Sequence, residues 1–417
     1  MKKIFIVFLG LFALAALSAA EAQTQDSCLD CHRAIGSGPF FAPAEAMKED
    51  VHAKFGISCA DCHGGDPKDS GFTSMDRSKG FIGVPKKVNI PGLCSRCHSN
   101  TSYIRRFNPN LPTDQLAKYR TSTHGRLNEK GDDKVAVCTS CHRAHSILPP
   151  DDTRSPVNVF NVPETCGKCH ADANYMAGYN IPTDQLEKYK SGVHGQMLLV
   201  KHDSGAPSCA SCHGSHDAAP PKIVQIASVC GKCHAIEAEL FIQSPHKAAY
   251  DAAEIPECVA CHNNHRNERT SDNMLGVGGE SLCINCHFSA DSKGYQAAQA
   301  IGASVDELKA KMAEADLLIV RAERAGMEVG EGRFSLVDAD HALVQIRAVI
   351  HSVSPDQVGK LAGDGIKLAA QANEVGKKAW AELQFRRRGL ALSLVFILMV
   401  VVALFFKIRD VDRRGGG

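Results

Sequence analysis

The chain has 417 residues, with 47 lysines and arginines against 46 aspartates and glutamates, and its formal net charge is +1 at pH 7. This balance gives no basic footprint of the kind that binds nucleic acid, so no nucleic-acid partner is predicted. The unusual component is cysteine, with eighteen residues, and their arrangement decides the class of protein.

The first residues predict an export signal. Lys2 and Lys3 form a positive n-region, residues 4–17 form a short apolar stretch, and an A-x-A sequence at 20–22 is typical of a cleavage site. We therefore predict a signal peptide over 1–22. The alternative is an uncleaved N-terminal membrane anchor.

The next segment, residues 23–288, contains nine copies of the pattern Cys-x-x-Cys-His, which together use every cysteine of the chain. In chain order, and numbered here as sites 1 to 9, the copies are Cys28/Cys31/His32, Cys59/Cys62/His63, Cys94/Cys97/His98, Cys138/Cys141/His142, Cys166/Cys169/His170, Cys209/Cys212/His213, Cys230/Cys233/His234, Cys258/Cys261/His262 and Cys283/Cys286/His287.

This pattern is the attachment sequence of c-type haem, in which two thiols bind the vinyl groups and the adjacent histidine becomes the proximal iron ligand. Structural zinc needs pairs of such knuckles, and nine cannot be paired. A thioredoxin-like site needs a single pair, and disulfides require neither the spacing nor the histidine. The sequence therefore predicts nine covalently bound haem c groups, which form most of the interior of a domain that does not fold without them.

The haem segment repeats internally. Residues 111–125 (LPTDQLAKYRTSTHG) and 181–195 (IPTDQLEKYKSGVHG) are identical at nine of fifteen positions. Each is followed by Cys-x-x-Cys-His-x-x-His and then by Cys-Gly-Lys-Cys-His, which indicates one leading site and four two-haem units. We predict a short helix over 113–125, and likewise over 183–195, from an N-cap threonine to a left-handed C-cap glycine that follows a histidine.

Seven histidines outside the motifs are candidate sixth ligands. Three come three residues after a proximal histidine, where the porphyrin blocks their own iron, so we expect them to bind neighbouring haems. The other four precede the first motif of a unit. The three that follow a proximal histidine are His145, His216 and His265, and the four upstream histidines are His52, His124, His194 and His246. His202 is an eighth candidate without a counterpart in the repeats, and an exposed loop position is equally open for it.

Nine sites outnumber these histidines, and Asp66 stands where the first unit would carry its Cys-His-x-x-His histidine. At least one iron is therefore expected to take another ligand or to keep an open position. The methionines that could serve are Met47, Met75, Met176, Met197 and Met274.

Residues 289–388 contain no cysteine and predict an antiparallel helical bundle. A capping box at 304–307 is expected to start the first helix, a second helix spans about 334–353, and Ser354 and Pro355 begin a third. Two histidines of this part are interpreted as ordinary helix residues: His341 and His351.

Residues 389–406 are eighteen uncharged residues, enough for roughly 27 Å of helix and therefore for a transmembrane span. A buried core helix is the alternative. Basic residues flank both ends, so orientation follows from the export signal. The haems are expected in the periplasm and the tail, 407–417, in the cytoplasm.

The doubled haem motifs, with Cys-His-x-x-His and an upstream histidine, resemble the cytochrome c3/c7-like family of doubled-CXXCH proteins over residues 28–287. The resemblance implies a mostly α fold with sparse secondary structure packed around bis-histidine haems of low potential, used in anaerobic or metal-linked respiration. It does not extend to the helical bundle.

Together these observations predict a periplasmic nonahaem cytochrome anchored in the inner membrane by one transmembrane helix. It would carry electrons between the membrane (the quinol pool or a membrane oxidoreductase) and periplasmic cytochromes, reductases or outer-membrane acceptors. The alternative is a reductase of a nitrogen or sulfur oxyanion that uses one open haem. Against an enzyme, every motif ends in histidine and no large insertion builds a substrate pocket, so no catalytic residue is predicted.

Overall fold

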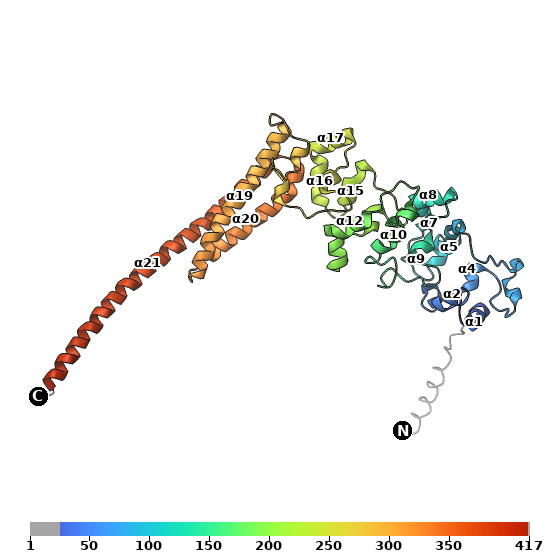
Figure 1. Ribbon diagram of the computed structural model, residues 1–417, viewed down its shortest axis with the longest axis horizontal. Helices are drawn as coiled ribbons and strands as arrows, with labels where there is room; N and C mark the ends of the chain where they lie inside the picture. The colour runs from blue at the N-terminus through green and yellow to red at the C-terminus, as the bar shows by residue number, and fades with distance from the viewer. Residues whose placement is uncertain (1–25, 416–417) are drawn as a thin grey trace, which may run out of the picture. The chain divides into compact units, whose positions relative to one another are not determined.

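The computed structural model describes residues 26–415, which contain helices and loops and no strand (Figure 1). The prediction of a mostly α fold is confirmed. The predicted signal peptide lies outside the described residues. The chain divides into two compact units, one made of residues up to 220 together with 265–267, the other of 221–264 and the residues from 268 onward.

Unit 1 consists of short helices joined by loops, and none of its described helices exceeds nine residues. The helices are α1 (Ser27–Ala34), α2 (Phe41–Ala46), α3 (Val51–Lys54), α4 (Cys59–His63), η1 (Phe72–Met75), η2 (Arg77–Lys79), η3 (Lys87–Asn89), α5 (Ile90–His98), α6 (Thr101–Ile104), α7 (Gln115–Thr121), α8 (Thr123–Glu129), α9 (Cys138–His142), α10 (Val162–His170), α11 (Ala173–Met176), α12 (Gln185–Ser191), α13 (Val193–Gly195), η4 (Gln196–Val200) and α14 (Cys209–His213).

Site 1 lies on α1, and two kinds of helix carry the other five haem motifs of unit 1. Helices α4, α9 and α14 are single turns in which the side chain of the third helical residue accepts a hydrogen bond from the N–H of the residue before the helix. The residue after the proximal histidine has a positive φ, as at Gly64 (71°), Arg143 (66°) and Gly214 (83°). This conformation stops the helix at the histidine and turns the chain away. Helices α5 and α10 are longer and begin with proline in their first turn, where a missing N–H costs no hydrogen bond.

The expected single helix over 113–125 is wrong, because Ser122 is extended and separates α7 from α8. The Ser122 hydroxyl caps α8 by accepting a hydrogen bond from the Gly125 N–H at 2.8 Å. Gly125 is helical rather than left-handed, and its role is close approach: a Cβ there would lie 1.9 Å from the carbonyl oxygen of Tyr119. Gly195 in the second repeat is equally crowded.

Unit 2 begins with the remaining haem motifs and ends with three long helices (Figure 1). Its helices are η5 (Ile223–Gln225), α15 (Ile226–Cys230), α16 (Ala235–Gln243), α17 (Pro245–Ala253), α18 (Val259–His262), η6 (Asp272–Met274), η7 (Cys283–Asn285), α19 (Lys293–Arg324), α20 (Gly330–Val349), η8 (Ile350–Ser352) and α21 (Pro355–Gly415).

Helices α19, α20 and the first part of α21 form the predicted antiparallel bundle, in which short turns make consecutive helices antiparallel. Two clusters of fully buried apolar side chains fill it, one around Ile319 and one around Leu308. Helix α19 starts at Lys293, well before the expected capping box, because its buried stripe already includes Ile301. Ser304 therefore lies inside the helix and its hydroxyl donates to the Ala300 carbonyl.

Helix α21 continues without a break from the bundle into the apolar segment. Its last core residue is Leu383, and the side chains of 389–406 are exposed. Among the described residues this is the one helix long and apolar enough to cross a membrane, with a mean hydropathy of 2.9 in its most apolar window.

Candidate haem sites

At sites 1 to 6 the whole motif lies within an α-helix, with its two cysteines three residues apart and its histidine directly after the second. At site 8 the helix begins after the first cysteine, at site 7 it ends at the first cysteine, and site 9 begins in the 3-10 helix η7. In an α-helix, residues i and i+3 share a face, so the turn presents both thiols and the imidazole to the same side. All the motif cysteines are partly or fully exposed, as a covalent attachment site requires. The local geometry therefore follows from the motif itself.

Within residues 26–415, a second histidine ring is seen to face the proximal ring at seven sites. The ring centroids lie 5.9–6.1 Å apart, and at four sites the rings are stacked within 14° of parallel. The pairs are His63–His145, His98–His52, His142–His216, His170–His124, His213–His265, His262–His351 and His287–His246.

This separation fits an iron held between two imidazoles. A metal–nitrogen bond of about 2 Å on each side, with roughly 1 Å from each nitrogen to its ring centre, predicts centroids roughly 6 Å apart. Several rings are also held by a hydrogen bond from Nδ1, which leaves Nε2 facing the partner histidine. His63 Nδ1 donates to the Gly83 carbonyl at 2.8 Å, and His213 Nδ1 donates to the Ala219 carbonyl at 3.2 Å.

Burial favours the neutral form of many of these imidazoles, which is the form that binds metal. Desolvation, with a smaller contribution from neighbouring histidines or charges, lowers the pKa of nine of them. They are His98, His124, His142, His145, His170, His216, His246, His262 and His265. The residues present thus fit c-type haem at these sites.

Comparison with known families agrees with this geometry. The family model described as cytochrome c3 matches residues 51–171, which include sites 2 to 5, and the doubled CXXCH motif matches residues 251–292, which include sites 8 and 9. The chain is a multihaem c-type cytochrome. Comparison with curated proteins and with solved structures found no match.

Two rules describe the histidine pairs of the cytochrome. At sites 2, 4 and 6 the partner is the histidine three residues after the proximal histidine two motifs later. At sites 3, 5 and 9 the partner lies upstream of the motif that precedes the site. The structure thus brings together six of the predicted distal histidines with proximal ones, and their role as iron ligands stays a prediction.

A repeated backbone contact sets these pairs. The residue before each of the first three upstream histidines donates its N–H to the carbonyl of the second residue after a Cys-His-x-x-His histidine. Val51 donates to Ile147 at 2.8 Å, Thr123 to Ala218 at 3.0 Å, and Val193 to Asn267 at 2.8 Å. Each contact holds two candidate distal histidines from distant parts of unit 1 side by side. We call it the clamp.

Asp50 reinforces the first clamp. Its side chain is 1% exposed, and its carboxylate accepts hydrogen bonds from the Ile147 N–H (2.7 Å), the His52 N–H (2.8 Å) and His52 Nδ1 (2.9 Å). Burial opposes ionisation, but these three bonds hold the pKa of Asp50 below its ordinary value. A carboxylate at Nδ1 increases the basicity of the imidazole.

The substitution Asp50→Asn should therefore raise the reduction potential at site 3. We expect a rise of roughly 50 mV, since a tenfold change in relative affinity for the two iron states is about 59 mV for a one-electron couple. Redox titration followed by electron paramagnetic resonance measures it. Asp76→Asn, a change at an exposed capping residue, is the matched control and should shift nothing. An unchanged potential in both variants contradicts the prediction.

The remaining predicted histidines are placed differently. His202 is exposed and its ring packs against Phe160 at 5.9 Å, so the loop alternative describes it better than a ligand role. His194 Nδ1 contacts the Asn267 side-chain oxygen at 3.2 Å. The pairing of His194 and of His234 stays a prediction.

His351 lies beside a proximal histidine, a position that the sequence does not predict. Its ring lies 6.1 Å from that of His262 at site 8. Helical spacing shows only which face of a helix a residue occupies, and no repeat contains His351. The signal that could have indicated it is the number of motifs. No motif lies two positions after site 8, so its partner histidine has to come from outside the repeats.

Cysteines of consecutive sites of the cytochrome interact with one another. Their thiols are close enough for hydrogen bonds or electrostatic coupling, which orders sites 1 to 6 in unit 1 and sites 7 to 9 in unit 2 as they occur in the sequence. The pairs are Cys28–Cys59, Cys62–Cys94, Cys94–Cys138, Cys141–Cys169, Cys166–Cys209, Cys230–Cys258 and Cys261–Cys283.

Five predicted thioether cysteines stand apart from these seven pairs, and each is the second cysteine of its motif. They are Cys31, Cys97, Cys212, Cys233 and Cys286. Four of them are exposed and Cys97 is partly buried, and in the described residues none of the eighteen cysteines forms a disulfide.

A thiol bound to a vinyl group would be covered by the macrocycle, so the protein side chains need not cover it. Among these second cysteines, Cys97 interacts with Cys62 of site 2 and Cys286 interacts with Cys261 of site 8. Thioether attachment at all nine sites stays a prediction.

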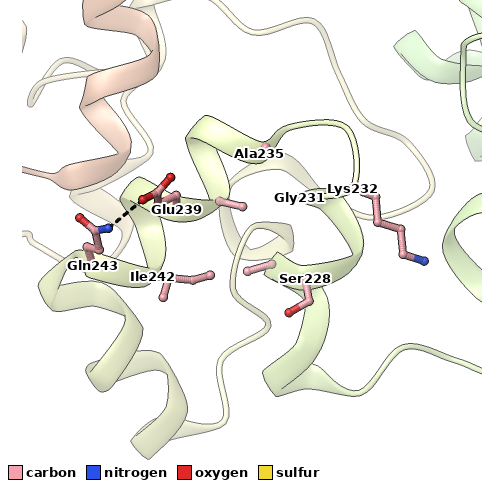
Figure 2. Close-up of a pocket in the computed structure, with 9 residues that line it drawn as sticks. Ser228, Gly231, Lys232, Ala235, Glu239, Ile242 and Gln243 are labelled. Atoms are coloured by element: carbon pink, nitrogen blue, oxygen red, sulfur yellow. Dashed lines mark hydrogen bonds between the residues drawn. The ribbon is translucent and has the colours of Figure 1, made fainter.

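An apolar hollow adjoins site 7. Helices α15 and α16 line it with Ala227, Ala238 and Ile242, and Glu239 and Gln243 are hydrogen-bonded at its edge (Figure 2). An apolar surface beside two thiols is the environment that the flat macrocycle of a covalently attached haem requires.

Proposed function

We propose that this cytochrome carries nine haem c groups and is a membrane-anchored electron conduit on the periplasmic side of the inner membrane. Bound haem supplies reversible one-electron chemistry. The residues of the chain supply covalent attachment, axial imidazoles and close spacing, which together set potentials and keep neighbouring sites in contact.

The observation that carries this proposal is the order of the cysteine contacts. Within each unit the thiols of consecutive sites interact by hydrogen bonds or electrostatics, so inside a unit electrons have a neighbouring centre at each step. Paired histidines at seven sites support six-coordinate iron, which favours electron transfer over substrate binding.

The apolar end of α21 supports attachment to a membrane, so we propose a membrane donor, either the quinol pool or a membrane oxidoreductase. Soluble periplasmic cytochromes or reductases, or outer-membrane proteins, would be the acceptors. Anaerobic respiration is the setting that low-potential bis-histidine haems suit.

The test uses the full-length protein in lipid vesicles. Stoichiometric reduction with a viologen donor should deliver nine electrons per molecule, and mixing with an oxidised soluble c-type cytochrome should withdraw all of them. Uptake of markedly fewer than nine electrons contradicts the haem count. Full reduction without reoxidation by any protein acceptor contradicts the conduit.

A second candidate function is favoured by site 1. The rule found at sites 3, 5 and 9 offers site 1 no partner, because it uses a histidine upstream of the preceding motif and site 1 is the first motif. In the described residues the ring contact of His32 is with Phe40, at 6.0 Å and 67°. A phenyl ring cannot coordinate iron, so we propose that site 1 binds small exogenous ligands, including the oxyanions of nitrogen or sulfur.

The second candidate is tested by ligand binding. The reduced protein should bind one carbon monoxide per molecule, and Phe40→His should abolish that binding by adding a ligand. Met47 is buried at the end of α2 and is the rival ligand. If Met47 coordinates the iron, the unsubstituted protein binds no carbon monoxide at site 1, whereas the Met47→Leu variant does. That result would contradict the second candidate function. Nitrite, hydroxylamine and tetrathionate with a viologen donor are the substrates to assay.

A further inference from the structure

The rule that gives sites 2, 4 and 6 their partner histidines provides no partner for site 8. Sites 2, 4 and 6 each pair with a histidine supplied two motifs later. Site 8 would need a tenth motif, and the sequence ends its motifs at site 9. A repeat array needs different residues at its end, since the last unit has no following neighbour to complete it.

The clamp also ends here. The first three upstream histidines are preceded by Val51, Thr123 and Val193, each of which donates its backbone N–H. The fourth, His246, is preceded by Pro245, which has no N–H to donate. The last unit is therefore built without the backbone contact that brings the next Cys-His-x-x-His segment into place in the other three.

The helical bundle occupies the place of the missing segment. Helix α16 packs against η8 and α20, and Gly294 in the first turn of α19 is so close to the site 9 ring that a Cβ there would lie 2.1 Å from His287 Nδ1. Asp272, from the loop between sites 8 and 9, accepts two hydrogen bonds of 3.0 Å from Arg347 on α20 and pairs with Lys309 on α19 at 2.9 Å.

His351 is held in the orientation that a ligand needs. Its Nδ1 donates to the Ala348 carbonyl at 2.8 Å, which fixes the tautomer with the lone pair on Nε2. The ring lies 6.1 Å from His262 with an interplanar angle of 32°, a separation that matches the other six pairs. Val353, with φ of 48°, follows η8 directly, so His351 lies at a rigid corner between α20 and α21.

We infer that His351 is the sixth ligand of the haem iron at site 8, and that the membrane-anchored bundle closes the haem array by supplying it. The inference rests on haem attachment at site 8, but not on the direction or partners of electron transfer. As a consequence, a coordinate bond connects His351 to site 8, the second-last site of the array. The chain corner at His351 continues into α21 and its apolar segment.

The test compares His351→Ala with His341→Ala in the full-length protein with its haems attached. His341 lies ten residues earlier, on α20; its side chain is 67% exposed, and in the described residues it contacts Asp338 rather than a proximal histidine. We expect His351→Ala to gain one high-spin ferric haem per molecule in electron paramagnetic resonance. The reduced variant should also bind one additional carbon monoxide, and added imidazole should reverse both changes.

With the haem mass unchanged, equal high-spin signals and equal carbon monoxide binding in the two variants would overturn the inference. His351→Met covers the case in which the alanine variant does not fold. It should keep every iron six-coordinate and raise the potential of one haem, since a methionine ligand raises the potential, whereas unchanged potentials overturn the inference. Neither outcome affects electron uptake by the unsubstituted protein, so the proposed function as an electron conduit is tested separately.

Discussion

Produced without covalently attached haem, this chain should fold only in its bundle. The two clusters of buried apolar side chains in the described residues both lie between residues 301 and 383. In the haem segment the buried apolar residues are few and scattered, as Ile104, Leu148 and Leu198 illustrate. Ordering a chain costs about 1.5 kcal/mol per residue, and so little burial cannot offset that cost without the macrocycles.

The experiment is cytoplasmic expression, where haem is not attached, compared with the exported protein. Intact mass should show a gain of roughly 616 Da per haem in the exported form only, nine times over. Limited trypsin digestion should destroy residues 26–288 of the haem-free form and leave a fragment containing α19, α20 and the start of α21. Protection of the haem segment in the haem-free protein would show that the side chains alone suffice to fold it.

Ending the chain after Arg388 should release the protein from the membrane with its haems intact. The last side chain of the bundle core is Leu383, so the truncation removes exposed apolar residues and no packed ones. Eighteen uncharged residues of this kind favour the bilayer by a few tenths of a kcal/mol each, a sum that carbonate or high salt does not overcome.

Fractionation followed by haem staining measures this release. A full-length variant with Arg386, Arg387 and Arg388 changed to glutamine is the matched control and should stay in the membrane fraction, because its apolar segment is intact. Membrane retention of the truncated protein would show that another part of the molecule makes the attachment.

Much of this cytochrome could be predicted from its sequence because the chemistry is local. Both thiols and the proximal imidazole of each site lie within five consecutive residues, so the motif alone identifies them. The bundle and the apolar segment follow from side-chain periodicity and hydropathy, which are also local properties. Helix boundaries differ from the prediction. Helix α19 starts before its expected capping box. Gly125 lies inside a helix, where the Tyr119 carbonyl leaves no room for a Cβ.

The distal pairing was decided only by the tertiary structure. His63 and His145 are separated by more than one whole repeat, and the backbone hydrogen bond that fixes the segment of His145, from Val51 to Ile147, has partners that carry no sequence signature. His351 could not be found from the repeat pattern because it lies outside the repeats, in the short helix η8 at the end of the bundle. Covalent attachment depends on neighbours in the chain, whereas the sixth position of an iron depends on which distant segment folds against it.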